Sequence, residues 1–186
     1  QAWLSTPNNG VDSEEKKIAL LQMFANSHVA LIYGSAGTGK STLINHISHF
    51  FSGESKLFLA QTHPAVENLR RRVNAANSTF STIARFTKSG RVQTEYDMLV
   101  IDECSTVSNR DMRAILRKTS FKLLVLVGDS YQIASIRFGN WFNVAYKFVP
   151  ATSVFELTKP YRSNNPNLLL LWERVRQMDD RVEETI

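Results

Sequence analysis

The sequence predicts an α/β fold in which a parallel β-sheet carries helices on both of its faces. Short apolar runs of strand length alternate along the chain with segments in which apolar residues recur at helical spacing. Crossovers of this kind are right-handed and place helices on both faces of the sheet. Polar motifs directly follow the apolar runs, and the carboxyl ends of parallel strands meet at one edge, where ligands bind in such sheets. The sequence therefore predicts a ligand site along that edge.

The expected strands are apolar runs rich in β-branched and aromatic residues. They lie, in chain order, at residues 28–33, 56–60, 98–101, 122–127 and 153–157. Residues 79–86 fit either a short strand or a turn of helix. Residues 88–97 are polar and are expected to form a loop or hairpin, and residues 131–149 are expected to be irregular.

The first helix is expected to begin near Ser13, because a hydroxyl cap is followed there by acids in the first turn. We expect Ile18, Leu21 and Phe24, with Leu20 nearby, to form its buried face. Apolar residues at helical spacing predict four further helices. One covers residues 41–51, and one begins at Pro64 with Val66, Leu69 and Val73 inside. Another is capped by Ser108 and carries the apolar residues Met112, Ile115 and Leu116, and the last covers residues 165–177.

Residues 34–42 read GSAGTGKST, which matches the phosphate-binding pattern G-x-x-x-x-G-K-[ST]. The glycines let backbone N–H groups turn toward an anion, and the N-terminus of the following helix adds unpaired N–H groups and a favourable dipole. Lys40 supplies a charge for the β- and γ-phosphates, and the Ser41 hydroxyl is a candidate Mg²⁺ ligand. An ordinary glycine-rich turn with an accidental lysine is the alternative. The expected nucleotide-binding residues are Gly34, Ala36, Gly37, Thr38, Gly39, Lys40, Ser41 and Thr42.

Asp102 and Glu103 directly follow the apolar run at residues 98–101. In a nucleotide site, Asp102 can hold Mg²⁺ directly or through water, and Glu103 can position or deprotonate the attacking water. The alternative is that the two acids only cap the sheet. A phosphate-binding loop upstream favours the catalytic interpretation.

Two further polar residues follow the fourth and fifth expected strands. Gln132 can sense a γ-phosphate through a neutral hydrogen bond, unless Gly128 and Asp129 simply close a turn at this point. Arg162 can reach developing phosphate charge as an arginine finger, unless it is an ordinary surface arginine.

The ordered set of motifs resembles a known family. In chain order the motifs are GSAGTGKST, AQTHPA, STIARF, VIDECS, VGDSYQ and KPYRS. Over about residues 13–178 this set resembles the first motor domain of superfamily 1 helicases, closest to the RecD-like branch. The resemblance implies a RecA-like fold within the P-loop NTPases. It also implies binding of ATP with Mg²⁺, and hydrolysis coupled to translocation on single-stranded nucleic acid, with DNA expected in preference to RNA.

The same resemblance implies residue roles. An ATP site would be formed by Lys40, Ser41, Asp102, Glu103, Gln132 and Arg162, and the nucleic acid would be met by Thr62, His63, Thr82 and Arg85. Residues 1–12 are expected to be a flexible lead-in, and residues 13–186 the motor domain. The family's second motor domain is not in this stretch and is an expected partner. The chain alone is therefore expected to hydrolyse ATP slowly and to unwind nothing.

The composition of this 186-residue chain limits the remaining possibilities. A net charge of +5 fits either a polyanionic partner or an evenly basic surface. No apolar stretch approaches the 18 residues that suggest a membrane helix, so no membrane partner is expected. A single cysteine, Cys104, excludes an internal disulfide framework and fits a reducing interior, so a cytoplasmic location is expected. The aromatic residues of 138–142 either stack on bases or anchor a loop.

Two other function classes stay open. The first is a nucleotide-gated binding module that switches conformation without motor work. The second is a small P-loop kinase or GTPase. The paired acids after a strand and the later Gly-Asp-x-x-Gln argue against this second class, and the sequence has no guanine-reading Asn/Thr-Lys-x-Asp element.

Overall fold

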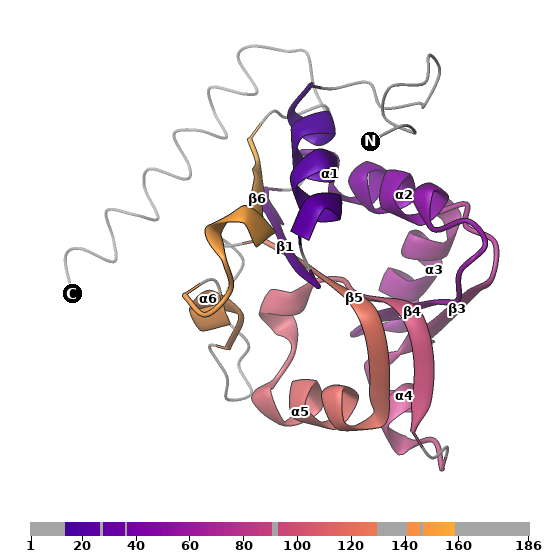
Figure 1. Cartoon of the computed structure of the whole chain (residues 1–186). Coiled ribbons are helices and arrows are strands. Elements are labelled where there is room, and N and C mark those ends of the chain that lie inside the picture. Colours follow the sequence, from indigo (N-terminus) through magenta and orange to yellow (C-terminus); the bar gives the residue numbers. More distant parts are fainter. Residues whose placement is uncertain are drawn as a thin grey trace, which may run out of the picture.

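A computed structural model describes residues 14–26, 28–35, 37–90, 93–129, 141–145 and 147–158. Within these ranges six strands form one sheet in the order β3-β2-β4-β5-β1-β6, and every pairing is parallel (Figure 1). The strands are β1 (Val29–Gly34), β2 (Lys56–Ala60), β3 (Ser78–Thr82), β4 (Thr94–Ile101), β5 (Thr119–Gly128) and β6 (Val154–Leu157). The helices are α1 (Glu14–Asn26), α2 (Lys40–Phe50), α3 (His63–Arg72), α4 (Ile83–Lys88), α5 (Asn109–Lys118) and α6 (Trp141–Ala145), with 3-10 turns η1 (Cys104–Thr106) and η2 (Ala151–Ser153).

The helices form two layers, one on each face of the sheet. Helices α1, α2 and α3 cover one face, and α4, α5 and α6 cover the other (Figure 1). Strand β1 shows why the sheet is buried on both sides, because Ala30 and Ile32 pack toward the first layer while Leu31 packs toward the second. The predicted parallel sheet with helices on both faces is confirmed.

Two predicted helices begin as expected. In α3 the Thr62 hydroxyl caps the N-terminus, and Pro64 lies in the first turn, where its missing N–H costs no hydrogen bond. Val66 and Leu69 of α3 are buried. In α5 the Ser108 hydroxyl accepts a hydrogen bond of 3.1 Å from the backbone N–H of Asp111.

The buried face of α1 differs from the expected one. Ile18 and Leu21 are 48% and 41% exposed, and the buried residues of this helix include Lys16, Ala19, Leu20 and Met23. Apolar residues lie around most of the circumference of α1, so their spacing alone does not select one stripe. The contacts of α1 with β6 and η2 decide which stripe is buried.

Two other apolar residues of the predicted helices are exposed. Phe50 of α2 and Leu116 of α5 are 40% and 44% exposed. Their neighbours on the inner side, Ile47 and Ile115, are fully buried. Both exposed residues lie in the last turn of their helices.

The strands extend beyond the apolar runs. Residues 79–86 form both of the alternatives in succession, because β3 is followed directly by α4. Strand β4 begins at Thr94, inside the stretch that was expected to be a loop or hairpin, and Thr94 pairs with Thr119 at the start of β5. These polar residues join the ladder because backbone pairing continues past the buried part of the sheet.

Two polar clusters hold the end of the sheet that lies away from the carboxyl edge. The Lys56 ammonium is buried and donates to the carbonyl oxygens of Phe51 (2.5 Å) and Glu54 (2.6 Å), which closes the turn between α2 and β2. The Asp97 carboxylate accepts hydrogen bonds from the N–H (2.9 Å) and hydroxyl (2.8 Å) of Ser55, and it pairs with Lys122 at 2.6 Å.

Two of the aromatic residues in 138–142 anchor α6 to the sheet. The ring of Phe142 is 2% exposed, and its centroid lies 4.8 Å from that of Tyr33 in β1. The indole N–H of Trp141 donates a hydrogen bond of 2.6 Å to the carbonyl oxygen of Val107. For these two residues the structure supports the loop-anchor interpretation; Phe138 lies outside the described residues.

Candidate nucleotide-binding site

The glycine-rich loop connects β1 to α2. Gly39 caps α2 with a φ of 87°, a conformation that residues with a side chain rarely adopt. A Cβ on Gly34 would lie 2.5 Å from the Thr38 hydroxyl oxygen and 2.8 Å from the carbonyl oxygen of Leu157, so this position also requires glycine. The Thr38 hydroxyl donates a hydrogen bond of 2.9 Å to the carbonyl oxygen of Ser35, which closes the loop.

Lys40 is the first residue of α2, and its side chain folds back along the loop. Its ammonium donates to the carbonyl oxygens of Gly34 and Ser35, the latter at 3.0 Å. Burial lowers the pKa of Lys40, while the carboxylates of Asp129, Asp102 and Glu103 oppose that shift. The loop lysine and these carboxylates therefore act on one another within a single site.

Asp102 and Glu103 follow β4 at the carboxyl edge. The Asp102 N–H continues the ladder to the Leu59 carbonyl oxygen at 2.9 Å, and the Asp102 carboxylate accepts from the Glu103 N–H at 2.9 Å. Glu103 has a left-handed backbone with φ 54°, a conformation that costs a non-glycine residue about 1–3 kcal/mol and that clusters at functional sites. Thr106 holds it there, donating to the Glu103 carbonyl oxygen from its N–H (2.9 Å) and hydroxyl (2.8 Å).

Burial shifts the protonation of both acids in the same direction. Desolvation raises the pKa of Asp102, against the opposing hydrogen bond from the Glu103 N–H and the charges of Lys40 and Arg72. Desolvation also raises the pKa of Glu103, and the neighbouring Asp102 charge raises it further. A carboxylate with a raised pKa is a better proton acceptor than an exposed one.

Strand β5 separates the loop strand from the acid strand. Adjacent strands lie about 4.8 Å apart, so β1 and β4 are about 10 Å apart across β5. Gly128 and Asp129, at the carboxyl end of β5, therefore lie between the loop and the acids. This spacing leaves room for a chain of phosphate groups between Lys40 on one side and Asp102 on the other.

A polar cleft of about 560 Å³ opens between these elements. The predicted residues that line it are Gly37, Gly39, Lys40, Ser41, Thr42, Asp102 and Glu103. It is also lined by residues that were not assigned to the site from the sequence, namely Asn45, Ala65, Asn68, Leu69, Arg72, Gly128 and Asp129. Four of these residues, Ala65, Asn68, Leu69 and Arg72, belong to α3 and follow the spacing of one helix face. This spacing is visible in the sequence and could have indicated them. Ala36, Gln132 and Arg162 lie outside the described residues.

The residues expected to meet nucleic acid lie at the same edge of the sheet but not in the cleft lining. Thr62, His63 and Arg85 are exposed, whereas Thr82 is 6% exposed. The Thr62 hydroxyl accepts from the Ala65 N–H at 3.3 Å, and the Thr82 hydroxyl accepts from the Arg85 N–H at 3.2 Å. Both threonines therefore cap helices.

The oxygen donors in the cleft fit Mg²⁺. Ser41 and Asp102 both line the cleft, and one Asp102 oxygen already accepts from the Glu103 N–H. Across the part of the chain that the structure describes, no group of three or more His, Cys, Asp or Glu side chains could hold a metal by itself. Proteins hold Mg²⁺ through one or two carboxylates together with phosphates and water, and the cleft offers one carboxylate, Asp102, and one hydroxyl, Ser41.

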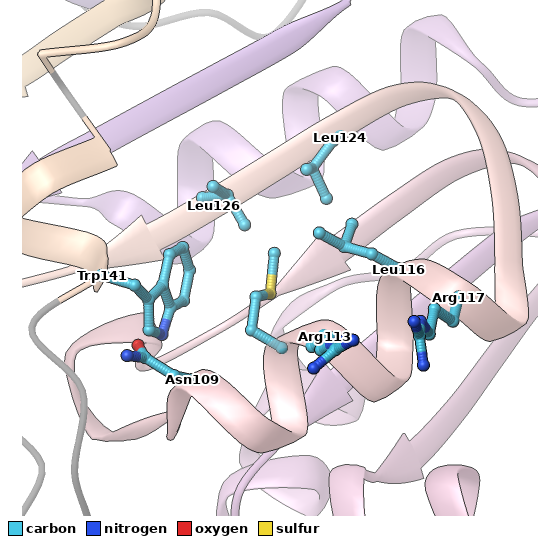
Figure 2. Close-up of a pocket in the computed structure, with 8 residues that line it drawn as sticks. Asn109, Arg113, Leu116, Arg117, Leu124, Leu126 and Trp141 are labelled. Atoms are coloured by element: carbon cyan, nitrogen blue, oxygen red, sulfur yellow. The ribbon is translucent and has the colours of Figure 1, made fainter.

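A second hollow, of about 520 Å³, lies between α5 and β5 on the opposite face of the sheet (Figure 2). Its lining residues are Asn109, Met112, Arg113, Leu116, Arg117, Leu124, Leu126 and Trp141. This lining has no carboxylate and no glycine-rich loop. The chemistry described above therefore belongs to the polar cleft.

Among the helices that the structure describes, none has the length and apolar character of a membrane-spanning helix.

Comparison with known proteins identifies the family. The chain belongs to the AAA domain family, whose sequence model matches residues 13–185. It is 31% identical over 136 residues to a probable conjugal transfer protein TraA of Sinorhizobium fredii, a match that covers 70% of this chain and 12% of that protein.

The fold of the chain is similar to a structure of Pif1 helicases at forked double-stranded DNA, with a TM-score of 0.64 and 17% identity over 89% of this chain and 48% of that one. It is also similar to a Bacteroides Pif1 helicase in complex with ADP-AlF3 and single-stranded DNA, with a TM-score of 0.54 and 15% identity over 90% of this chain and 46% of that one.

These comparisons confirm the predicted fold class, a RecA-like P-loop NTPase sheet, and the resemblance to superfamily 1 helicase motor domains. The chain spans 12% of the length of TraA and less than half of each Pif1 chain. The RecD-like branch is not distinguished from other branches and stays a prediction.

Proposed function

We propose that this chain is the ATP-binding motor domain of a superfamily 1 helicase of the RecD-like branch, in which ATP hydrolysis drives translocation on single-stranded nucleic acid. The observation that carries the proposal is the polar cleft, where the glycine-rich loop after β1 faces Asp102 and Glu103 across β5. A loop for phosphates and a pair of half-buried acids in one cleft are what phosphoryl transfer to water requires.

The side chains of the cleft divide the work of hydrolysis. Lys40 and the N–H groups at the start of α2 bind the phosphates, which requires Lys40 to exchange its loop carbonyl partners for phosphate oxygens. Ser41 and Asp102 would hold Mg²⁺, which when bound neutralises charge on the phosphate oxygens. Glu103 orients the attacking water and accepts its proton. Gln132 and Arg162 are proposed to contact the γ-phosphate.

The nucleic acid is proposed to run over the carboxyl ends of β2 and β3. Thr62, His63, Thr82 and Arg85 follow these neighbouring strands, in which Ala60 pairs with Thr82. A net charge of +5 supports a polyanionic partner, and one similar Pif1 structure contains single-stranded DNA. DNA is proposed in preference to RNA, with a second motor domain of the complete protein closing the other side of the channel.

Nucleotide binding tests the first part of the proposal. Lys40→Ala is expected to weaken Mg·ADP binding by about 10- to 100-fold, because it removes a charge-assisted contact to phosphate. Isothermal titration calorimetry measures this change, and Lys88→Ala, an exposed lysine on the opposite layer, is the matched control. Equal Mg·ADP affinity in the wild type and Lys40→Ala would contradict a nucleotide site in this loop.

Turnover tests the second part. Glu103→Gln is expected to retain nucleotide binding and to lower phosphate release by about 10²- to 10⁴-fold, because it removes the proton acceptor. Phosphate release with and without single-stranded DNA measures this in the complete protein. Nucleotide-dependent DNA binding with no turnover in the wild type would favour the nucleotide-gated switch instead of the motor.

A further inference from the structure

One wall of the cleft is formed by a single face of α3. Ala65, Asn68, Leu69 and Arg72 line it, and these positions follow the i, i+3, i+4, i+7 spacing of one helix face. Helix α3 ends in three successive arginines, but only Arg72 of the three lines the cleft. The charge that α3 brings to the cleft is therefore the guanidinium of Arg72.

The direction of this side chain follows from helix geometry. Side chains in an α-helix lean toward its N-terminus, and α3 begins at the carboxyl edge of the sheet directly after β2. The Arg72 side chain is therefore expected to lean along α3 toward this edge, where Asp102 follows β4. The charge of Arg72 acts on the Asp102 carboxyl and opposes the upward shift of its pKa that burial causes.

The guanidinium of Arg72 is available for a ligand. Among the residues that the structure describes, Arg72 makes no hydrogen bond or ion pair. Arg70, two residues earlier, differs because it pairs with Glu67 at 3.3 Å and lies 5.4 Å from the centre of the Phe80 ring. A guanidinium carries five N–H donors in a planar fork, which suits bidentate binding of a phosphate.

The strand order indicates which phosphate Arg72 can meet. Helix α2 and Lys40 extend from β1, whereas α3 extends from β2, which is the neighbour of the acid strand β4. The reacting phosphate of a nucleoside triphosphate lies at the acid end, because Glu103 must reach the water that attacks it. Arg72 thus lies on the side of the terminal phosphate.

We propose that Arg72 is a phosphate-binding residue that contacts the terminal phosphate of a nucleoside triphosphate from the α3 wall, opposite Lys40. The cleft then distinguishes triphosphate from diphosphate through one side chain that only the longer ligand reaches. This inference rests on the proposed function, since it takes the cleft to be a nucleotide site.

The test compares two nucleotides in the 186-residue chain. Calorimetry with Mg²⁺ measures the affinity for ADP and for an ATP analogue with a non-hydrolysable β,γ-imido bridge. Arg72→Ala is expected to weaken analogue binding by about 10- to 100-fold and to leave ADP binding within about 2-fold. Arg72→Lys, which keeps the charge but not the fork, is expected to fall between these limits. Arg71→Ala, the same change on the neighbouring exposed arginine, is the matched control.

Each outcome has one meaning. Analogue affinity in Arg72→Ala equal to that in Arg71→Ala would overturn the inference, and so would an equal loss for ADP and analogue. Thermal unfolding without nucleotide checks that Arg72→Ala folds, and Arg72→Lys provides the comparison if it does not. Lys40→Ala distinguishes a failure of the proposed nucleotide site from a failure of the role of Arg72. If Lys40→Ala leaves both affinities unchanged, the proposed function fails. If Lys40→Ala weakens both while Arg72→Ala weakens neither, only the role of Arg72 fails.

Discussion

The ring of Phe142 lies so close to Gly128 that a Cβ on Gly128 would be 2.3 Å from ring atom Cε1 and 2.5 Å from Cζ. Gly128 ends β5 and precedes Asp129, and both residues line the polar cleft. Phe142 therefore packs against the backbone of a strand that contributes to the site. The absence of a side chain at Gly128 allows α6 to lie directly against the end of β5.

Gly128→Ala is expected to destabilise the protein by about 1–3 kcal/mol, the usual cost of overpacking a core. The added methyl group must displace the Phe142 ring, which is buried against Tyr33. Chemical denaturation followed by circular dichroism measures the free energy of unfolding. Gly53→Ala is the control, because nothing lies within 4 Å of its Cβ position. A Gly128→Ala protein as stable as Gly53→Ala would contradict the packing described above.

Trp141→Phe is expected to lower the free energy of unfolding by about 1–3 kcal/mol, because the Val107 carbonyl oxygen loses its indole donor. The substitution keeps an aromatic ring next to Phe142, although it also removes part of the indole that lines the hollow beside α5. Phe148→Leu, at an aromatic residue that is 81% exposed, is expected to have little effect in the same denaturation experiment. Equal stability of the two variants would show that the bond to Val107 contributes nothing.

Stability is expected to fall in acid through Asp97. The hydrogen bond from Lys122 and the two from Ser55 hold the pKa of Asp97 well below its usual range. A carboxylate with a lowered folded-state pKa stabilises the protein fully above its unfolded pKa of about 3.9, and this contribution is lost as the pH falls below that value. Asp97→Asn is therefore expected to flatten the fall in melting temperature below about pH 4. Glu95→Gln, an exposed acid on the same strand, should keep the wild-type slope.

Substitutions of Thr62 are expected to separate its cap from its proposed contact with nucleic acid. Thr62→Ala should cost about 1 kcal/mol of stability, whereas Thr62→Ser keeps a hydroxyl for the Ala65 N–H. Fluorescence anisotropy with a labelled single strand across a salt series then tests binding. Thr62→Ala with His63→Ala should weaken binding relative to Thr62→Ser. An unchanged curve for the double variant would remove this edge from the proposed path of the strand.

The residues of the site that the sequence predicted well belong to continuous motifs. The loop that contains Lys40 has a backbone that only glycine can adopt at certain positions. A Cβ on Gly34 would clash with its neighbours, and Gly39 has a positive φ. The position of Asp102 and Glu103 in the site was predictable because they directly follow a buried apolar run, and the end of such a strand lies at the carboxyl edge of the sheet. Local sequence was sufficient in these cases because neighbouring residues in the chain determine the geometry.

The features that were missed depend on residues far apart in the chain. Arg72 lines the cleft because α3 follows β2, the neighbour of β4 in the sheet. The three successive arginines of α3 do not show from the sequence which of them faces the cleft. The buried face of α1 was wrong because its partners, β6 and η2, lie more than a hundred residues later. Strand β3 was ambiguous because Ser78–Thr82 has a polar sequence and pairs only with β2 among the described strands.

The buried ammonium of Lys56 has an electrostatic consequence at the other end of α2. It donates to the carbonyl oxygen of Phe51, the residue that caps the C-terminus of this helix. The negative pole of the α2 dipole is therefore matched permanently by a cation of the chain itself. The positive pole, at Lys40, has no such internal counter-charge on the helix, since the first turn contains no acid. The carboxylates that act on Lys40 come instead from the ends of β4 and β5, so an anion that enters the cleft meets N–H groups of α2 that no acid of the helix itself covers.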